Sequence, residues 1–420
     1  MKFKIITLGC KVNTYESNVI KDNLENHGFI EDDNADVYII NTCTVTNTSD
    51  NKSLKELRRV KREHPDAITI VCGCMSQVRT NIEDCGADII LGNKYKSEIY
   101  DLIEEYKRNK KQLIKIDSIM EAPFEKMQLN NFNRTRAFVK IEDGCENYCA
   151  YCIIPYARGK VRSKAPQDVI DEISTLVKNG HKEVVLTGIH TGHYGADLKD
   201  YNFAMLLSEL VKIDGLERIR ISSIEMNELT EEVLDVIKNN PKIVDHLHIP
   251  IQSGSNEILK LMNRKYLKDD FIAKIEEIRS IRPDINITTD IIVGFPGETD
   301  KLFQETIETV NKIHFSKIHV FPFSLRKGTK AEELPNHIDE VTKKQRVKEL
   351  MAISEQLEKE YMAKYLNKKI VFIPEVSRDG YLIGHTGNYL LVKAPGSDKL
   401  LHQDVEVTVT DIKYPYVIAK

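Results

Sequence analysis

Three cysteines stand close together in the run Cys145-Glu-Asn-Tyr-Cys149-Ala-Tyr-Cys152. Cysteine thiolates are the usual protein ligands of iron–sulfur clusters, and a cubane [4Fe–4S] cluster has four irons to ligate. Because this loop supplies only three thiolates, one iron of such a cluster stays open to another ligand. A zinc site or part of a disulfide framework is the alternative. Zinc prefers a fourth protein ligand, and none stands in the loop.

The aromatic residue Tyr151 directly precedes the last of these cysteines. The CxxxCxxC pattern with that aromatic resembles the signature of the radical S-adenosylmethionine (radical SAM) enzymes. In that superfamily the open iron chelates the amino and carboxylate groups of S-adenosylmethionine, and an electron from the cluster cleaves the sulfonium. The resemblance implies a 5′-deoxyadenosyl radical, whose chemistry belongs to the cofactors while the protein positions them.

A series of strand-like segments surrounds this loop. Strands are expected over 137–142, 183–187, 218–222, 246–251, 286–293 and 317–323, with helical stretches between them. Six such units predict a partial (β/α)6 barrel, the shape of radical SAM cores, with its site at the C-terminal strand ends. The polar and glycine residues that follow these strands are expected to bind the cofactor, although an ordinary βα turn is the alternative for each motif alone. The predicted cofactor-binding residues are Tyr151, Thr187, Gly188, Ser223, Glu225, Gln252, Ser253, Gly294 and Gly297.

A second set of three cysteines is spread over the first part of the chain. Cys10, Cys43 and Cys74 each follow a short apolar run. Strands are expected over 4–8, 36–41, 67–72 and 87–91, separated by helical segments, which predicts a parallel sheet with crossover helices. Ligands collect at the carboxyl ends of such strands, so the three thiolates can converge on one site. Core cysteines that happen to end strands are the alternative.

Two of the eight cysteines are left over. Cys72 is expected to lie in a strand as a small buried apolar residue, because Cys74 repeats the Gly-Cys pattern of Cys10 and is the better ligand. Cys85 stands in a loop that no strand precedes, and no role is predicted for it.

The last sixty or so residues have a different pattern. Short alternating strands are expected over 369–376, 380–385, 389–394 and 404–414, split by turns rich in Gly, Asn, Asp and Ser. They predict a small five-stranded β-barrel, an architecture that often binds nucleic acid. A barrel that only packs against the core is the alternative. The residues that would suit an RNA surface are Lys364, Lys368, Lys369, Arg378, Lys393, Lys413, Tyr381 and Tyr389.

Length and composition fit this division. At ~150 residues per domain, 420 residues predict about three domains, and we expect them at 1–125, 131–357 and 360–420. No apolar run reaches the ~20 residues that span a bilayer. The apolar stretch Ile5–Leu8 is too short for the core of a secretory signal, which favours a cytoplasmic protein with metal-binding rather than disulfide-bonded cysteines.

Both cysteine sets and the terminal barrel, in this order, resemble the methylthiotransferase family over the whole chain. Its signatures stand here as Leu-Gly-Cys10-Lys-Val-Asn13-Thr-Tyr-Glu16, Asn41-Thr-Cys43 and Gly73-Cys74-Met-Ser-Gln77. The resemblance implies that Cys145, Cys149 and Cys152 hold the radical SAM cluster. It also implies that Cys10, Cys43 and Cys74 hold an auxiliary [4Fe–4S] cluster, and that the terminal barrel is an RNA-binding TRAM domain.

Loop residues indicate a branch of that family. The opening Gly-Cys-Lys-Val-Asn and the segments 186–198 and 319–329 resemble the branch acting on N6-threonylcarbamoyladenosine (t6A) at tRNA position 37. The branches acting on isopentenyladenosine-37 of tRNA and on ribosomal protein S12 usually open differently, and they remain alternatives. A further alternative is a radical SAM RNA-modifying enzyme whose second cluster only relays electrons, with Cys72 as a conceivable fourth ligand. A non-catalytic RNA-binding protein or redox sensor is the remaining one.

The family resemblance implies a reaction and its partners. One S-adenosylmethionine methylates a sulfur on the auxiliary cluster, and a second yields the radical that abstracts hydrogen from C2 of adenine. The substrate is then the anticodon stem-loop of a tRNA carrying t6A37, whose base must be unstacked to be reached. An electron donor of flavodoxin or ferredoxin type and an unidentified sulfur donor complete the expected partners.

Overall fold

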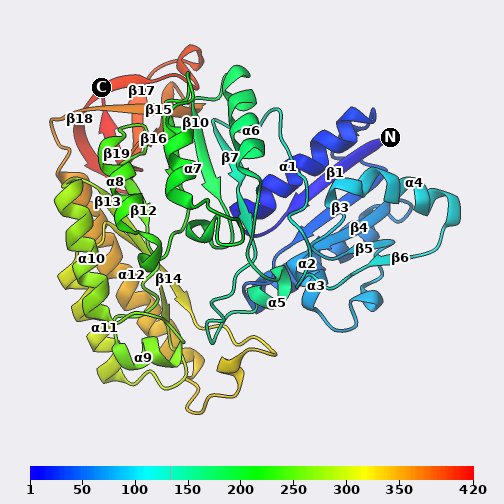
Figure 1. Cartoon of the computed structure of the whole chain (residues 1–420), viewed down its shortest axis with the longest axis horizontal. Coiled ribbons are helices and arrows are strands. Elements are labelled where there is room, and N and C mark those ends of the chain that lie inside the picture. Colours follow the sequence, from blue (N-terminus) through cyan, green and yellow to red (C-terminus); the bar gives the residue numbers. More distant parts are fainter. Residues whose placement is uncertain (133) are drawn as a thin grey trace.

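A parallel six-stranded sheet forms the N-terminal part of the protein, described here from a computed structural model that covers residues 1–132 and 134–420 (Figure 1). The strand order is β2-β1-β3-β4-β5-β6, and every pairing is parallel, as the alternation of strands and helices predicts. The strands are β1 (Lys2–Thr7), β2 (Ile30–Glu31), β3 (Val37–Thr42), β4 (Ile68–Gly73), β5 (Ile89–Leu91) and β6 (Leu113–Lys115).

Helices cover both faces of this sheet. The central strands β3 and β4 are buried at every position, which requires apolar side chains on both faces, and both strands are rich in Ile and Val. One face packs against α1 and α4, and the other packs against α2 and α3. The helices are α1 (Lys11–Asn26), α2 (Asn47–Glu63), α3 (Cys74–Val78) and α4 (Ile99–Asn109).

The central part is an open barrel of six parallel strands. Two three-stranded sheets, β11-β10-β7 and β12-β13-β14, are joined by single bridges from Ile219 to Ile243 and from Ser223 to His248. The strands are β7 (Arg136–Lys140), β10 (Glu183–Thr187), β11 (Arg218–Ile221), β12 (His246–His248), β13 (Asn286–Val293) and β14 (Lys317–Pro322). The strand expected over 246–251 is shorter than predicted, because Pro250 has no N–H to continue the ladder.

The helices of the central part are α5 (Ile154–Arg158), α6 (Pro166–Lys178), α7 (Phe203–Leu210), α8 (Glu231–Asn239), α9 (Asn256–Leu261), α10 (Lys268–Ile281), α11 (Asp300–Ile313) and α12 (Glu340–Ala363). Helices α10 and α11 lie on the outer side of the barrel, whereas α5 lies beside α3 of the N-terminal part (Figure 1). A two-stranded hairpin, β8 (Glu142–Asp143) with β9 (Arg162–Ser163), flanks the loop that carries Cys145. No helix of the described residues is both long and apolar enough to cross a membrane.

The C-terminal part is a closed five-stranded barrel in the order β15-β16-β17-β19-β18, as predicted. Its strands are β15 (Lys369–Arg378), β16 (Tyr381–Thr386), β17 (Leu391–Pro395), β18 (Val405–Lys413) and β19 (Tyr416–Ala419). Helix α12 joins the two barrels, because Leu350 and Leu357 pack in the central core while Tyr361 and Met362 pack in the terminal one. The limits at 125, 131, 357 and 360 stay a prediction.

Candidate active site

The fold brings Cys10, Cys43 and Cys74 to one edge of the N-terminal sheet. Cys10 follows β1 at the start of α1, Cys43 follows β3, and Cys74 begins α3 directly after β4. These three strands are neighbours in the parallel sheet, so their carboxyl ends lie side by side. Gly9 shows how close the turns are, because a β-carbon there would lie 2.6 Å from the Cys43 Cβ. Its φ of +101° also favours glycine.

Polar side chains tie the three turns together. The Asn13 side-chain amide donates to the carbonyl oxygens of Leu8 (2.7 Å) and Thr42 (2.8 Å), and so joins the ends of β1 and β3. The Thr42 hydroxyl donates to the Cys72 carbonyl (2.7 Å) and accepts from the Met75 N–H (3.2 Å), joining β3 to β4. These bonds position the three cysteines without using their sulfurs.

The thiols of this set influence one another. Burial raises the pKa of Cys43 to about 11, and the thiols of Cys74 and Cys10 add to that rise. Burial also raises the pKa of Cys10, which Arg158 opposes and Cys74 reinforces, although the side chain remains accessible to solvent. Binding a metal cluster here therefore requires protons to leave.

The two leftover cysteines lie elsewhere. Cys72 points into the core beneath α1 and α4, among Ile20, Ile70 and Ile99, and is fully buried. Burial raises its pKa to about 12. Cys85 is half-buried in the opposite layer, beside α2. Neither residue faces the three cysteines at the sheet edge.

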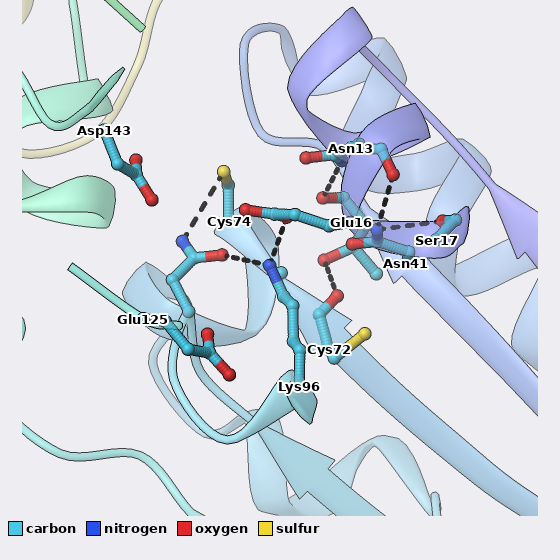
Figure 2. A network of polar contacts seen from close by, with 12 residues as sticks. Asn13, Glu16, Ser17, Asn41, Cys72, Cys74, Lys96, Glu125 and Asp143 are labelled. Atoms are coloured by element: carbon cyan, nitrogen blue, oxygen red, sulfur yellow. Dashed lines mark hydrogen bonds and ion pairs between the residues drawn. The ribbon is translucent and has the colours of Figure 1, made fainter. Parts of the chain in front are cut away.

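A buried ion network surrounds Cys74 (Figure 2). Arg158, fully buried at the end of α5, donates from Nε to the Cys74 sulfur (3.1 Å) and from a terminal nitrogen to Glu16 (2.6 Å). Glu16 also pairs with Lys140 (2.8 Å) and with Lys96. Burial opposes ionisation of Glu16, but Arg158, Lys140 and Lys96 hold its pKa well below the ordinary value.

Asp143 extends the same network. It pairs with Lys140 (2.8 Å), Arg158 (3.2 Å) and Arg162 (3.2 Å). Four buried cations thus share two carboxylates, Glu16 and Asp143, in the described network. The positive excess next to Cys74 suits an anionic group such as a thiolate-ligated cluster, because a buried charge needs compensation. The donor set and its electrostatics therefore fit an iron–sulfur cluster.

The loop that carries the other three cysteines follows β8. Gly144 has a φ of +91°, and a β-carbon there would collide with the Lys160 carbonyl, so the turn into Cys145 requires glycine. The Ala150 N–H donates to the Met262 carbonyl (2.9 Å), and the Ala150 carbonyl accepts from Ala331 (2.8 Å). These two bonds fix the loop directly after Cys149.

Charged and polar groups contact the sulfurs of this loop. Arg264 donates to the Cys149 sulfur (3.4 Å) and pairs with Glu225 (2.7 Å). The His190 Nδ1 lies 3.9 Å from the Cys145 sulfur, and its ring also contacts Glu228. Burial raises the pKa of Cys152 to about 12, with Cys149 contributing. Three thiols with one arginine donor fit a second cluster of three protein ligands.

The two cysteine sets are close neighbours in the fold. Helix α5 begins two residues after Cys152 and ends at Arg158, the residue that donates to Cys74. It lies beside α3, which begins at Cys74 (Figure 1). The short helix α5 therefore connects the loop of one set with a sulfur of the other.

A cavity of about 720 Å³ occupies the inside of the open barrel. All three parts of the chain line it: Cys10 and Lys11 from the N-terminal part, strand residues of the central barrel, and Tyr389 and Leu390 from the terminal barrel. Pockets of ~300–1,000 Å³ hold small molecules and cofactors. Of the residues predicted to hold a cluster or to bind the cofactor, four line it, namely Cys10, Thr187, Gly188 and Ser223.

Tyr151, Glu225 and Gln252, which are also predicted to bind the cofactor, are not among the residues that line the cavity. Glu225 pairs with Arg264, and Tyr151 packs edge-on against Phe295 at 6.4 Å. Gln252 bridges to Ile291 with a φ of +68°. Their roles stay predictions.

Ser253, Gly294 and Gly297 are not among the lining residues either. Ser253 is fully buried against Thr306 of α11. The Gly294 N–H donates to Glu298 (2.6 Å), and the Gly297 N–H donates to the Asn336 carbonyl (3.0 Å), so both glycines form a turn. For these three residues a cofactor contact also stays a prediction.

Sequence reasoning missed several residues of this site. Arg158 and Arg264 lie far in sequence from the sulfurs they contact, Cys74 and Cys149, and no local pattern links them. Asn13 and Glu16 stand within a quoted signature, yet their roles become visible only in three dimensions. Tyr389, expected on an RNA surface, instead lines the cavity, because its ring stacks on His246 with centroids 4.7 Å apart.

Comparisons with known proteins show the family of the chain. Residues 139–310 match the radical SAM superfamily, and residues 2–92 match a family described as uncharacterized protein family UPF0004. The chain is 44% identical to the threonylcarbamoyladenosine tRNA methylthiotransferase MtaB of Bacillus subtilis (strain 168), over 98% of this chain and 94% of that protein. A Thermotoga maritima protein of the same name is 38% identical over 92% of this chain and 90% of its own length.

A relative named for a different tRNA substrate has a lower sequence identity. The tRNA-2-methylthio-N(6)-dimethylallyladenosine synthase of Caldicellulosiruptor saccharolyticus is 35% identical over 97% of this chain and 90% of its own length. Among solved structures, the radical SAM methyltransferase TsrM from Kitasatospora setae has a TM-score of 0.58 at 14% identity, covering 79% of this chain and 76% of that one. That similarity shows the fold.

Proposed function

This chain belongs to the radical SAM tRNA methylthiotransferases, and we propose that it attaches a methylthio group to C2 of t6A at position 37 of tRNA. The sequence identity to two proteins named as threonylcarbamoyladenosine tRNA methylthiotransferases is 44% and 38%, against 35% for the dimethylallyladenosine relative. The isopentenyladenosine and ribosomal-protein branches are therefore not favoured.

The observation that carries the proposal is that two three-cysteine sets lie one short helix apart, and that one of them reaches the cavity of the barrel. Cys10 of the dispersed set lines the cavity together with the strand-end residues Thr187, Gly188 and Ser223. Cys72, the conceivable fourth ligand of an electron relay, is fully buried in the core beneath α1 and α4. This supports a dispersed set of three ligands with an open corner, which sulfur transfer needs and a relay does not.

The residues of the chain perform distinct tasks in this reaction. Bound S-adenosylmethionine and two [4Fe–4S] clusters supply radical hydrogen abstraction from C2 and the methylthio group that replaces the hydrogen. Cys145, Cys149 and Cys152 would hold one cluster, and Cys10, Cys43 and Cys74 would hold the other. Arg158 and Arg264 stabilise thiolate charge by donating to Cys74 and Cys149. Cys10 lines the cavity, so a base bound there would lie next to the dispersed set.

The partners follow from the same proposal. The substrate is the anticodon stem-loop, with base 37 extruded into the cavity, and the terminal barrel acts as a TRAM domain that binds RNA. Tyr381 and Lys393, whose ammonium lies 4.5 Å from the Tyr381 ring centroid, remain accessible on that barrel. A flavodoxin- or ferredoxin-type reductant and a separate sulfur donor are required, and the cytoplasm supplies tRNA and these partners.

Mass spectrometry of a reconstituted reaction tests the proposal. The anaerobic enzyme is incubated with dithionite, S-adenosylmethionine and anticodon stem-loops that carry t6A37, isopentenyladenosine-37 or unmodified A37. We expect the methylthio derivative of t6A and 5′-deoxyadenosine. Methylthiolation of the isopentenyladenosine stem-loop alone would move the protein to the other branch. Absence of 5′-deoxyadenosine with every stem-loop would exclude a radical enzyme.

A further inference from the structure

Lys11 is a cation of the cavity wall, and none of the described residues forms an ion pair with it. It is the first residue of α1, directly after Cys10, and its side chain lines the cavity. Among the described residues, no carboxylate pairs with its ammonium and no acceptor receives a hydrogen bond from it. A half-buried ammonium without an acceptor is costly, so it marks a place where a ligand can compensate the charge.

The other charged groups of the cavity wall are already compensated. Lys317 pairs with Glu358 (3.0 Å), and Arg220 pairs with Glu183 (2.9 Å). Asp290, the remaining carboxylate of the lining, lies 3.2 Å from His248. Of the lysines and arginines that line the cavity, Lys11 is thus the one that no carboxylate of the described residues pairs with.

The surroundings of Lys11 favour an anion. Arg220, Arg136 and the Tyr389 hydroxyl lie within electrostatic reach of its ammonium. The same cavity holds a second unsatisfied group, because the buried Nδ1 of His246 has no hydrogen-bond partner. His246 is more than nine-tenths buried, so bulk water does not reach this nitrogen. The Lys11 ammonium indicates a negatively charged occupant, and the imidazole nitrogen indicates that the occupant is polar.

We propose that Lys11 is a specificity-determining residue that binds the carboxylate of the threonylcarbamoyl group, next to Cys10. The inference rests on the function proposed above. A t6A base carries a carboxylate on its N6 substituent, whereas isopentenyladenosine carries an apolar chain that would leave the ammonium unpaired. A site with a buried group that needs a partner rejects an analogue lacking it far better than an apolar pocket rejects an extra group.

A backbone phosphate of the tRNA is the other source of negative charge. A phosphate contact would strengthen the binding of every stem-loop equally, because phosphates carry no information about the base. The carboxylate contact strengthens only a ligand that carries a free carboxylate. The two sources are therefore separable by comparing ligands that differ in that one group.

Binding measurements with matched ligands test the inference. Fluorescence anisotropy gives the Kd of the anaerobic two-cluster enzyme, without S-adenosylmethionine, for stem-loops carrying t6A37, the neutral methyl ester of t6A37, or A37. Charge-assisted hydrogen bonds contribute about tenfold to a hundredfold in affinity, so we expect the wild type to prefer t6A to its ester by that factor. Lys11→Gln should reduce the preference to about threefold or less, and Lys11→Arg should retain most of it.

A matched control lies on the same helix. Lys21 of α1 pairs with Glu31 outside the cavity, so Lys21→Gln should keep the full preference. The iron content of each variant shows whether the neighbouring Cys10 still holds its cluster. Should Lys11→Gln lose iron, the methyl-ester comparison in the wild type and Lys11→Arg still decide the matter.

Each unfavourable result has a distinct meaning. An unchanged preference in Lys11→Gln, or no preference in the wild type, overturns the role of Lys11 even when the methylthio product of t6A forms. Equal weakening for all three stem-loops assigns Lys11 to a phosphate instead. Failure to form the methylthio product in the reconstituted reaction refutes the proposed function itself, whatever the binding data show.

Discussion

The two cysteine sets are assembled by opposite routes. Cys145, Cys149 and Cys152 lie in one loop, where backbone contacts such as that from Ala150 to Met262 fix the chain. Cys10, Cys43 and Cys74 come from three strand ends and depend on the whole sheet. The difference teaches that one continuous segment brings three cysteines together by its own sequence, whereas the dispersed set depends on the relative positions of three strands.

The electrostatic support differs in the same way. Arg158 beside Cys74 is fully buried and contacts two carboxylates and Asn13, within a network of four cations. Arg264 beside Cys149 pairs with the single carboxylate Glu225 and with the Tyr266 hydroxyl. The dispersed set therefore concentrates more buried charge around its sulfurs, and its stability depends more on individual polar residues.

The largest expected effect separates the chemical roles of the two sets. Cys149→Ala removes a ligand of the loop set, so both 5′-deoxyadenosine and methylthiolated t6A should vanish. Cys74→Ala should abolish methylthiolation while 5′-deoxyadenosine still forms, and each variant should keep about half of the iron. Chromatography of the nucleosides with iron analysis checks both. Methylthiolation that survives Cys74→Ala would remove the dispersed set from the reaction.

The next effect compares the two arginines through stability. Arg158→Met leaves Glu16 and Asp143 with fewer buried cations, and breaking such a network costs about 3–5 kcal/mol of unfolding free energy. Arg264→Met should cost less, because Glu225 is partly accessible to solvent. Urea denaturation under anaerobic conditions measures both variants. Exposed Arg59→Met, at the surface of α2, is the control and should change stability by about 0.5 kcal/mol or less.

A glycine pair tests whether close turns matter to the dispersed set. Gly9→Ala places a β-carbon 2.6 Å from the Cys43 Cβ at a φ of +101°, so the turns must separate. We expect a loss of about 1–3 kcal/mol in stability and a reduced iron content, read by denaturation and iron analysis. Gly28→Ala has a φ of +78° but meets no atom within 4 Å, so it should keep its iron. Equal iron in both variants would contradict the close-turn explanation.

The two sets also differ in how far the sequence predicts them. The loop is readable from spacing alone, and the ends of β1, β3 and β4 follow from apolar runs before Cys10, Cys43 and Cys74. The partners of those sulfurs do not follow, because Arg158 meets Cys74 only through the contact between α5 and α3. The sequence predicts Tyr389 on an RNA surface for the same reason, because a barrel surface that packs against the core looks polar and aromatic in sequence. In the fold, Tyr389 lines the cavity.

The smallest expected effect concerns Cys72, two residues before Cys74. Its side chain is fully buried among isoleucines in the core beneath α1 and α4. Cys72→Ala should therefore leave the iron content and methylthiolation unchanged and cost about 1 kcal/mol of stability through lost contacts. Cys74→Ala is the matched control, because it alters a neighbouring cysteine on the same strand end. If Cys72→Ala lost the auxiliary iron, the dispersed site would have four ligands, and an electron relay would explain it better than sulfur transfer.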